Sequence, residues 1–198
     1  MKQEVASFLD YVAHSPTVFQ ATQQACDMLD AAGFTRLSEH EAWEILPGGR
    51  YYVTRNRSAL VAFAVPENGF THCQIVASHG DSPTFKLKAH AEGEAAGAYI
   101  RLDVEPYGGM IMSTWFDRPL SIAGRALVRE DGRLVTRLID LDRDAALIPN
   151  MPIHFNRDIN SGYSYNPQTD MLPLFGGKDA KGALAAEIAA KAGAKEED

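Results

Sequence analysis

The sequence predicts an α/β protein in which helices pack on a mixed sheet, followed by a part rich in β-strands. The first third of the chain alternates amphipathic helical patterns with β-prone runs, whereas from about residue 85 one β-prone run follows another with glycine turns between them. Its 198 residues, 45% of them hydrophobic, suit one core or two small ones. We therefore expect two domains, residues 1–88 and 89–198.

Two helices are predicted at the beginning of the chain. Apolar residues three and four positions apart form one stripe on a helix that ends near His14. Ser15 and Pro16 then supply an N-cap and a first-turn proline for a second helix, which Gly33 stops. The stripe of the first helix consists of Val5, Phe8, Leu9 and Val12.

The β-prone runs come next. Runs 51–55 and 59–65 flank Asn56-Arg57-Ser58, which predicts a hairpin. Run 73–78 (CQIVAS) is almost continuously apolar, as in strands buried on both faces by helices, and chemistry often lies where such a strand ends. The second half contains four further β-prone runs, 85–90, 98–104, 120–129 and 134–141. A closing helix is predicted over residues 179–194, with Asp179 as its N-cap.

Charge and cysteine content narrow the class of protein. The net charge of −7 is spread along the chain, so neither nucleic acid nor an anionic membrane is an expected partner. Cys26 and Cys73 are interpreted as small buried hydrophobic residues and not as a disulfide, which fits a reducing compartment. Residues 1–9 have no apolar run typical of a signal peptide, and no 18-residue apolar segment follows. We expect a cytoplasmic protein.

The strongest chemical motif is Ser78-His79-Gly80-Asp81-Ser82-Pro83, directly after the predicted buried strand. An imidazole at a strand end can bind a metal with one nitrogen while an aspartate two residues later holds the other. A hydrogen-bonded turn at a strand end is the alternative interpretation. His72 adds nothing, because seven residues along an extended chain place it on the opposite face from His79. Self-contained zinc, phosphate-loop and serine-nucleophile motifs are absent from the sequence.

Four segments, in order, together resemble the aspartyl aminopeptidase and aminopeptidase I family of zinc aminopeptidases. They are residues 77–88 (ASHGDSPTFKLK), 107–125 (YGGMIMSTWFDRPLSIAGR), 148–157 (IPNMPIHFNR) and 165–174 (YNPQTDMLPL). The opening helix followed by Ser15-Pro16-Thr17 also matches. The resemblance therefore extends through nearly the whole chain.

The resemblance implies a catalytic α/β domain interrupted by an inserted β-rich dimerisation domain, with dimers that build large tetrahedral assemblies, dodecamers in the full-length family. It implies removal of the amino-terminal residue from peptides by two zinc ions and a bridging water. His79 would bind one zinc and Asp81 would orient it. The other ligands of the family match nothing after Asp170, so this chain by itself is expected to be inactive and to bind zinc poorly.

The resemblance also has departures and open alternatives. Ser113 stands where some members have a histidine that reaches a neighbouring subunit's substrate, and Pro119 replaces an acidic residue found in those members. Both departures favour a broader specificity for the amino-terminal residue of the substrate over a strictly acidic one. Asp117 and Arg118 either contact substrate across a subunit boundary or form an internal ion pair. Met112, Trp115 and Phe116 form either a partner-facing apolar patch or part of a domain core. His154 and Arg157 follow a proline turn, and we expect them to lie on a strand as packing and hydrogen-bonding residues.

Two further functions compete with the peptidase. The β-rich half could act as a self-association module without catalysis. The chain could instead be a small-ligand binding domain unrelated to peptidases. The presence of four family segments in the same order would then have to be a coincidence. The resemblance favours the first interpretation, the amino-terminal portion of a metal-dependent aminopeptidase.

Overall fold

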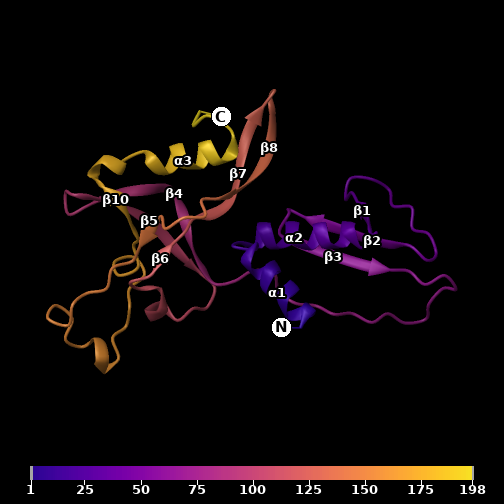
Figure 1. Ribbon diagram of the computed structural model, residues 1–198, viewed down its shortest axis with the longest axis horizontal. Helices are drawn as coiled ribbons and strands as arrows, with labels where there is room; N and C mark the ends of the chain where they lie inside the picture. Colours follow the sequence, from indigo (N-terminus) through magenta and orange to yellow (C-terminus); the bar gives the residue numbers. More distant parts are fainter. Residues whose placement is uncertain (1, 198) are drawn as a thin grey trace. The chain divides into compact units, whose positions relative to one another are not determined.

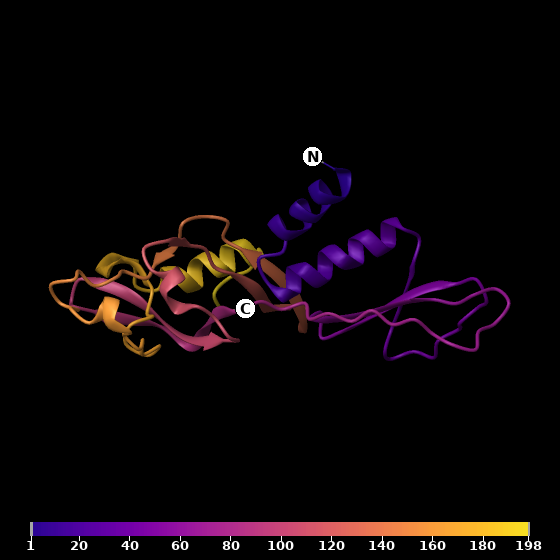
Figure 2. The same ribbon diagram turned by 90° about the horizontal axis from the view of Figure 1, so that it is seen from below.

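The computed structural model describes residues 2–197 and divides into two compact units after Ser82 (Figures 1 and 2). The first unit has two helices and a small sheet, and the second is mostly β-structure with one helix. This mixed α/β content agrees with the predicted fold class. Whether the two units act as a catalytic part and an assembly part stays a prediction.

The first unit is built from a mixed three-stranded sheet and two helices. Strand order is β1-β2-β3, with β2 parallel to β1 and antiparallel to β3, so the predicted hairpin is confirmed. The short parallel strand β1 was not predicted. The elements are α1 (Gln3–Ala13), α2 (Val18–Ala31), β1 (Thr35–Leu37), β2 (Arg50–Arg55) and β3 (Ala59–Ala64).

The N-cap of α2 differs from the prediction. Thr17, not Ser15, takes the extended cap conformation, and its Oγ1 accepts a hydrogen bond of 3.2 Å from the backbone N–H of Phe19. A threonine cap satisfies one of the helix's first free N–H groups as well as a serine would. The pair Ser15-Pro16 therefore belongs to the turn that separates the two helices.

A buried tyrosine joins α2 to the sheet. Tyr52 on β2 is fully buried, and its hydroxyl donates a hydrogen bond of 2.7 Å to Oδ1 of Asp30. Burial, reinforced by this hydrogen bond, raises the pKa of Tyr52 to about 12. Burial also raises the pKa of the Cys26 thiol, which stays neutral and packs as the small hydrophobic residue that was predicted.

The prediction of a buried strand over residues 73–78 is wrong for this chain. The segment has no strand pairing, and every residue in it is exposed, including Cys73. Ile75 and Val76 retain 80% and 94% of their accessible surface. A strand is held by hydrogen bonds to a neighbouring strand, and none of residues 2–197 pairs with this run.

The second unit contains a five-stranded antiparallel sheet, order β4-β5-β10-β9-β6, and a separate β7-β8 ribbon. Helix α3 follows the last strand, and its N-cap is Gly182 and not Asp179. The predicted run 120–129 divides into two strands, and two short strands were missed. The elements are β4 (Thr84–Ala95), β5 (Tyr99–Tyr107), β6 (Pro119–Leu120), β7 (Ala123–Glu130), β8 (Arg133–Asp140), β9 (Ala146–Leu147), β10 (Leu174–Gly177) and α3 (Ala183–Ala192).

Three hydrophobic clusters form the core of the second unit. Two of them include a residue of α3, Leu184 or Ala192, so the helix is held against both the main sheet and the ribbon. Complete burial of a side chain such as leucine contributes about 1.5–3 kcal/mol. The fully or nearly buried members are Leu102, Val104, Phe116, Val128, Ile139, Leu141, Ala145, Ile148, Met171, Leu184 and Ala192.

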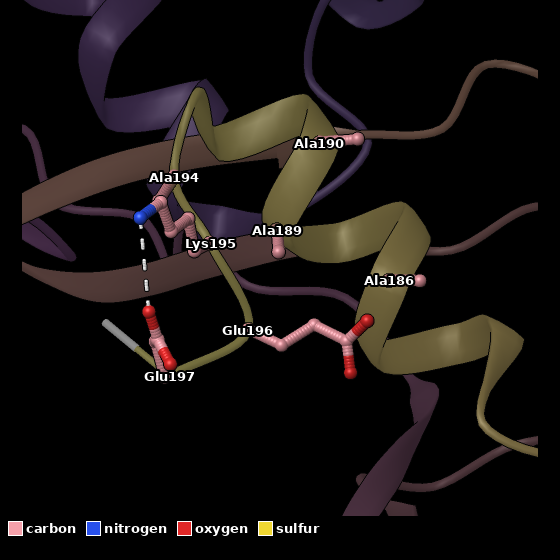
Figure 3. A pocket seen from close by; sticks show the side chains of 7 residues that line it. All are labelled: Ala186, Ala189, Ala190, Ala194, Lys195, Glu196 and Glu197. Carbon is pink, nitrogen blue, oxygen red and sulfur yellow. Dashed lines mark ion pairs between the residues drawn. The ribbon is translucent and has the colours of Figure 1, made fainter.

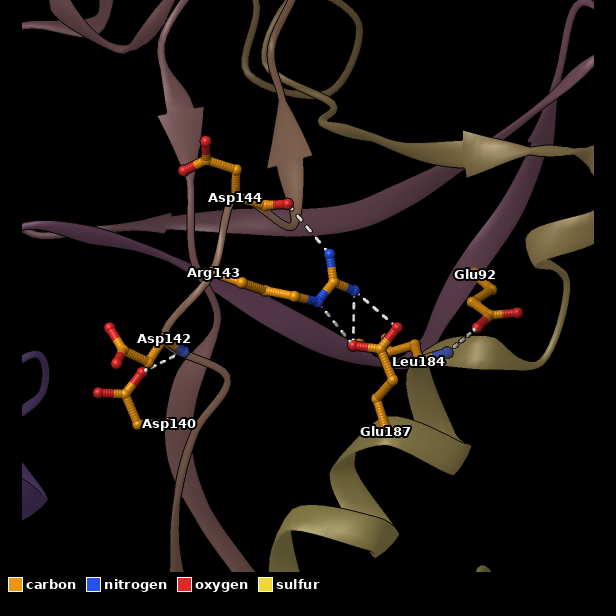
Figure 4. Close-up of polar contacts among 7 residues, drawn as sticks. All are labelled: Glu92, Asp140, Asp142, Arg143, Asp144, Leu184 and Glu187. Carbon is orange, nitrogen blue, oxygen red and sulfur yellow. Dashed lines mark hydrogen bonds and ion pairs between the residues drawn. The ribbon is translucent and has the colours of Figure 1, made fainter.

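A long-range cap fixes the beginning of α3 (Figure 4). An irregularity in the β4-β5 ladder lies between Leu87 and Glu92, and the Glu92 carboxylate accepts hydrogen bonds from the backbone N–H groups of Gly182 (2.6 Å) and Leu184 (3.0 Å). Further along the helix, the guanidinium of Arg143 binds both carboxylate oxygens of Glu187. A negative charge at a helix N-terminus is favourable, so sheet and helix stabilise each other.

Candidate metal-binding segment

The candidate site lies on the exposed segment between β3 and β4. The Nδ1 atom of His79 is 2.8 Å from the backbone oxygen of Asp81 and 3.3 Å from its carboxylate Oδ1. A carbonyl oxygen only accepts hydrogen bonds, so Nδ1 carries the proton and donates it. The neutral imidazole then keeps its lone pair on Nε2, which is the form that binds a metal ion.

Accessibility at this segment permits a ligand to approach. The His79 side chain retains 83% of its accessible surface and the Asp81 side chain 39%. Gly80 has no positive φ, and a Cβ added there would meet only Val18 Cγ2 at 3.9 Å, an ordinary contact. The turn therefore does not depend on glycine at this position.

A complete metal site is absent from residues 2–197. No group of three or more His, Cys, Asp or Glu side chains in this range lies close enough together to hold an ion. A catalytic zinc takes about three protein ligands and a water. The described residues thus fit one ligand with its orienting partner and do not fit a whole site, so no catalytic step through a metal is derived from them.

The candidate substrate residues lie in the second unit, and the structure gives two of them local partners. Asp117 has a left-handed φ of 55°, and its Oδ1 accepts a hydrogen bond of 2.9 Å from the backbone N–H of Asn150. Arg118 Nη1 donates a 3.4 Å hydrogen bond to the backbone oxygen of Thr114. Ser113 is exposed on a short 3₁₀ turn, Met112–Trp115. The sequence pattern gave no signal for the contact between Asp117 and Asn150.

The aromatic stretch beside these residues is core. Phe116 is buried with Ile148 and Met171, and Met112 and Trp115 pack against this cluster. Trp115 also meets Phe85 edge to face, with ring centroids 5.0 Å apart. The alternative of a partner-facing patch is therefore not supported for these three side chains.

The prediction of a strand carrying His154 and Arg157 is wrong. Both residues are exposed in turns between β9 and β10, where Pro149 and Pro152 stand close together in the sequence. Proline cannot donate to a strand ladder, and this favours turns over pairing here.

A hollow of about 480 Å³ lies beside α3, at the end of the described chain (Figure 3). Alanines line most of it, and Lys195 and Glu197 form an ion pair of 3.8 Å at its rim. It contains no histidine or cysteine. Its two glutamates could contact a cation, but no group of three or more metal-binding side chains occurs among residues 2–197, so the candidate site stays with His79.

Comparison with known proteins agrees with the resemblance. A family model described as aminopeptidase I zinc metalloprotease (M18) matches residues 11–197. The chain belongs to the M18 aminopeptidase family. Curated M18 relatives include a probable M18 family aminopeptidase 2 of Clostridium acetobutylicum, 43% identical over 186 residues, which are 89% of this chain and 42% of that protein. Aspartyl aminopeptidase 1 of Schizosaccharomyces pombe is 44% identical over 177 residues, 85% of this chain and 37% of the relative.

Solved M18-like structures agree as well. A cryo-EM structure of the Ape4 and Nbr1 complex matches with a TM-score of 0.88 and 36% identity, covering 94% of this chain and 39% of that one. The dodecamer of yeast mApe1 matches with a TM-score of 0.80 and 25% identity, and the match covers 99% of this chain and 46% of the mApe1 chain. The chain thus spans about two fifths of the length of the curated M18 relatives. In the part of the chain that the structure describes, no helix is long and apolar enough to cross a membrane.

Proposed function

We propose that this chain supplies the amino-terminal part of an M18 zinc aminopeptidase and contributes one metal ligand, His79, to a site that other residues of the enzyme complete. The observation that carries the proposal is the contact of His79 Nδ1 with Asp81, which leaves Nε2 available in an exposed side chain. The match to a zinc metalloprotease family supports zinc as the metal.

Asp81 is a positioning residue in this proposal. Its backbone oxygen and carboxylate both lie on the Nδ1 side of the ring, so they hold the tautomer and restrain ring rotation. A nearby carboxylate also makes the imidazole a stronger electron donor. Zinc, when bound by the complete enzyme, would polarise the peptide carbonyl and activate a water, with two ions in each site.

The chain alone is not expected to hydrolyse peptides. One imidazole provides a third of the protein ligands that a catalytic zinc needs, and ligands from the remainder of the enzyme would supply the others together with a general base. We therefore expect little bound zinc and no turnover from the 198 residues by themselves.

On the substrate side, we assign Ser113, Asp117 and Arg118 to a surface that meets a neighbouring subunit. The second unit would be the inserted dimerisation domain, and the dodecamer formed by yeast mApe1 supports a homo-oligomer built from dimers. Ser113 carries no charge, which favours neutral as well as acidic amino-terminal residues. Peptides are the expected substrates and the cytoplasm the expected location.

A second candidate function is self-association without catalysis. It is favoured by the second unit, which has three hydrophobic clusters and a helix capped by its own sheet and so has the features of an independently stable module. Under this alternative the chain would form oligomers, and His79 would have no role in them.

The test replaces the matched segment of the Clostridium acetobutylicum relative with this chain, giving a chimeric protein. We expect the chimeric protein to cleave leucine and aspartate p-nitroanilides, whereas the 198-residue chain alone cleaves neither. Light scattering of both proteins addresses assembly. An oligomeric chimeric protein with bound zinc and no turnover would favour the non-catalytic alternative, and turnover by the isolated chain would contradict the proposal.

A further inference from the structure

The turn after β3 contains a residue pair that the candidate metal-binding segment does not use, Asn68-Gly69. It lies in residues 65–83, which have neither helix nor strand (Figure 1). At the beginning of this run, the backbone N–H of Val65 donates a hydrogen bond of 2.9 Å to the backbone oxygen of Gly49. Asn68 and Gly69 themselves are both exposed, so solvent reaches the side-chain amide and the peptide bond that follows it.

Glycine leaves the peptide nitrogen after Asn68 accessible. A residue without a Cβ does not crowd its own backbone nitrogen. Gly69 has a positive φ of 76°, and a Cβ built on it would meet no other atom within 4 Å. The short asparagine side chain reaches the backbone that follows it, as it does in asparagine turns. The surroundings of this pair therefore leave room for the side chain of Asn68 to close a ring with the chain.

We propose that Asn68 is a site of spontaneous covalent modification, in which its amide becomes a carboxylate by way of a cyclic imide. The backbone nitrogen of Gly69 attacks Cγ of Asn68: the N–Cγ bond forms, the Cγ–Nδ2 bond breaks, and Nδ2 leaves as ammonia with the proton of the attacking nitrogen. Water then opens the five-membered ring. Hydrolysis at Cγ yields aspartate, and hydrolysis at the backbone carbonyl carbon yields isoaspartate, in which the chain continues through the side chain.

The other asparagines of the sequence are less suited to this reaction, because only Asn68 is followed by glycine. Asn166 precedes Pro167, whose nitrogen is bonded to three carbons and carries no proton, so ring closure is blocked. Asn160 precedes Ser161, whose backbone N–H already donates a hydrogen bond of 2.8 Å to the backbone oxygen of Asp158. The remaining asparagines precede residues with long side chains: Asn56, Asn150 and Asn156.

Modification changes the connection that leads from β3 to His79. Each event converts a neutral amide into a carboxylate and makes the formal net charge of −7 more negative by one unit. The isoaspartyl product also adds a methylene group to the backbone. The reaction needs only water, so this inference is independent of the proposed function. Its failure would leave the role of His79 untouched, and a failure of zinc binding would leave the modification of Asn68 untouched.

Peptide mapping of the 198-residue chain, before and after prolonged incubation, tests the proposal. Tryptic peptide 58–86 contains Asn68 and no other asparagine. We expect it to gain one mass unit and to separate into two products of equal mass, aspartate and isoaspartate. Fragmentation of peptide 158–178 should show conversion at least about tenfold slower at Asn160 and none at Asn166. A rate at Asn68 no higher than at Asn160 would overturn the proposal.

Unfolding separates the influence of the fold from that of the sequence. Because the turn is exposed, Asn68 in the native chain should be modified at a rate within about tenfold of that in the chain unfolded by urea. A larger reduction in the native chain would show that the fold protects the turn, and this result would also overturn the proposal.

Two variants test the assigned atoms. Asn68→Gln retains an exposed amide, but its closure would need a six-membered ring, so the gain in mass of peptide 58–86 should disappear. Gly69→Ala places a methyl group beside the attacking nitrogen and should slow the reaction at least about tenfold. Thermal unfolding checks that both variants fold. A persistent gain in mass in Asn68→Gln would assign the change to Gln74 of the same peptide, and an unchanged rate in Gly69→Ala would contradict the part given to glycine.

Discussion

The backbone N–H of Leu184 donates a hydrogen bond of 3.0 Å to Oε1 of Glu92, 92 residues earlier in the chain. The second oxygen of the same carboxylate accepts from Gly182. A helix whose own N-cap residue is a glycine without a side chain thus receives its cap from the neighbouring sheet.

Removing this cap should destabilise the second unit. Glu92→Ala is expected to lower the free energy of unfolding by about 1–2 kcal/mol, because two N–H groups lose their acceptor. Hydrogen exchange of the Leu184 amide should accelerate in parallel. Glu94→Ala is the matched control: Glu94 forms an exposed 3.1 Å ion pair with Lys181, and such pairs contribute less than about 1 kcal/mol. Equal losses in both variants would show that the cap is not important.

Tyr52 should make stability depend on pH in the alkaline range. Tyr52→Phe removes the hydrogen bond to Asp30 and is expected to cost about 1 kcal/mol near neutral pH. The folded-state pKa of about 12 lies above the ordinary value of 10. The unfolded chain therefore binds fewer protons between these values, and the contribution of Tyr52 is complete below pH 10 and is lost as pH rises toward 12.

The measurement is chemical denaturation of the parent chain and of Tyr52→Phe between pH 8 and about 12, the range in which tyrosine titrates. We expect the advantage of the parent to shrink above pH 10. Tyr99→Phe, at a half-exposed tyrosine, serves as the control and should parallel the parent. An advantage that is constant across the range would contradict the raised pKa.

Asp117 distinguishes a structural role from a substrate role. Its oxygen accepts from Asn150, and its φ of 55° is tolerated by asparagine and glycine better than by alanine. We expect Asp117→Asn to keep the stability of the parent within about 0.5 kcal/mol, Asp117→Gly to lose about 1 kcal/mol, and Asp117→Ala to lose more, since it also adds backbone strain.

Urea unfolding of the three variants gives this order directly. If Asp117→Asn were as unstable as Asp117→Ala, the negative charge itself would matter, and the hydrogen bond would not explain the residue. In the chimeric protein, a loss of activity in Asp117→Asn without a loss of stability would support contact with the substrate.

Local patterns were sufficient to predict much of the fold. The stripe of α1, the hairpin of β2 and β3 and the β-rich second half follow from residue spacing and turn chemistry, which act over short distances. Strands β9 and β10 could not be predicted, since they are short and are held by pairing with distant segments. The same limit applies to the cap of α3, whose acceptor lies on β4.

Residues 73–78 show a different limit. An almost continuous apolar run indicates a strand buried on both faces, yet burial requires neighbours, and among residues 2–197 this run has none. For the candidate site, the spacing of His79 and Asp81 correctly indicated that the two residues could meet. It could not indicate that the contact involves the backbone oxygen of Asp81 as well as its carboxylate.

Zinc content measured by mass spectrometry after dialysis tests the central claim most directly. In the chimeric protein we expect bound zinc, reduced at least about tenfold by His79→Ala, because loss of a ligand weakens a zinc site. His72→Ala, an exposed histidine seven residues earlier, should change nothing, and the isolated chain should retain almost no zinc. Full zinc occupancy in the His79→Ala chimeric protein, or stoichiometric zinc in the isolated chain, would contradict the role given to His79.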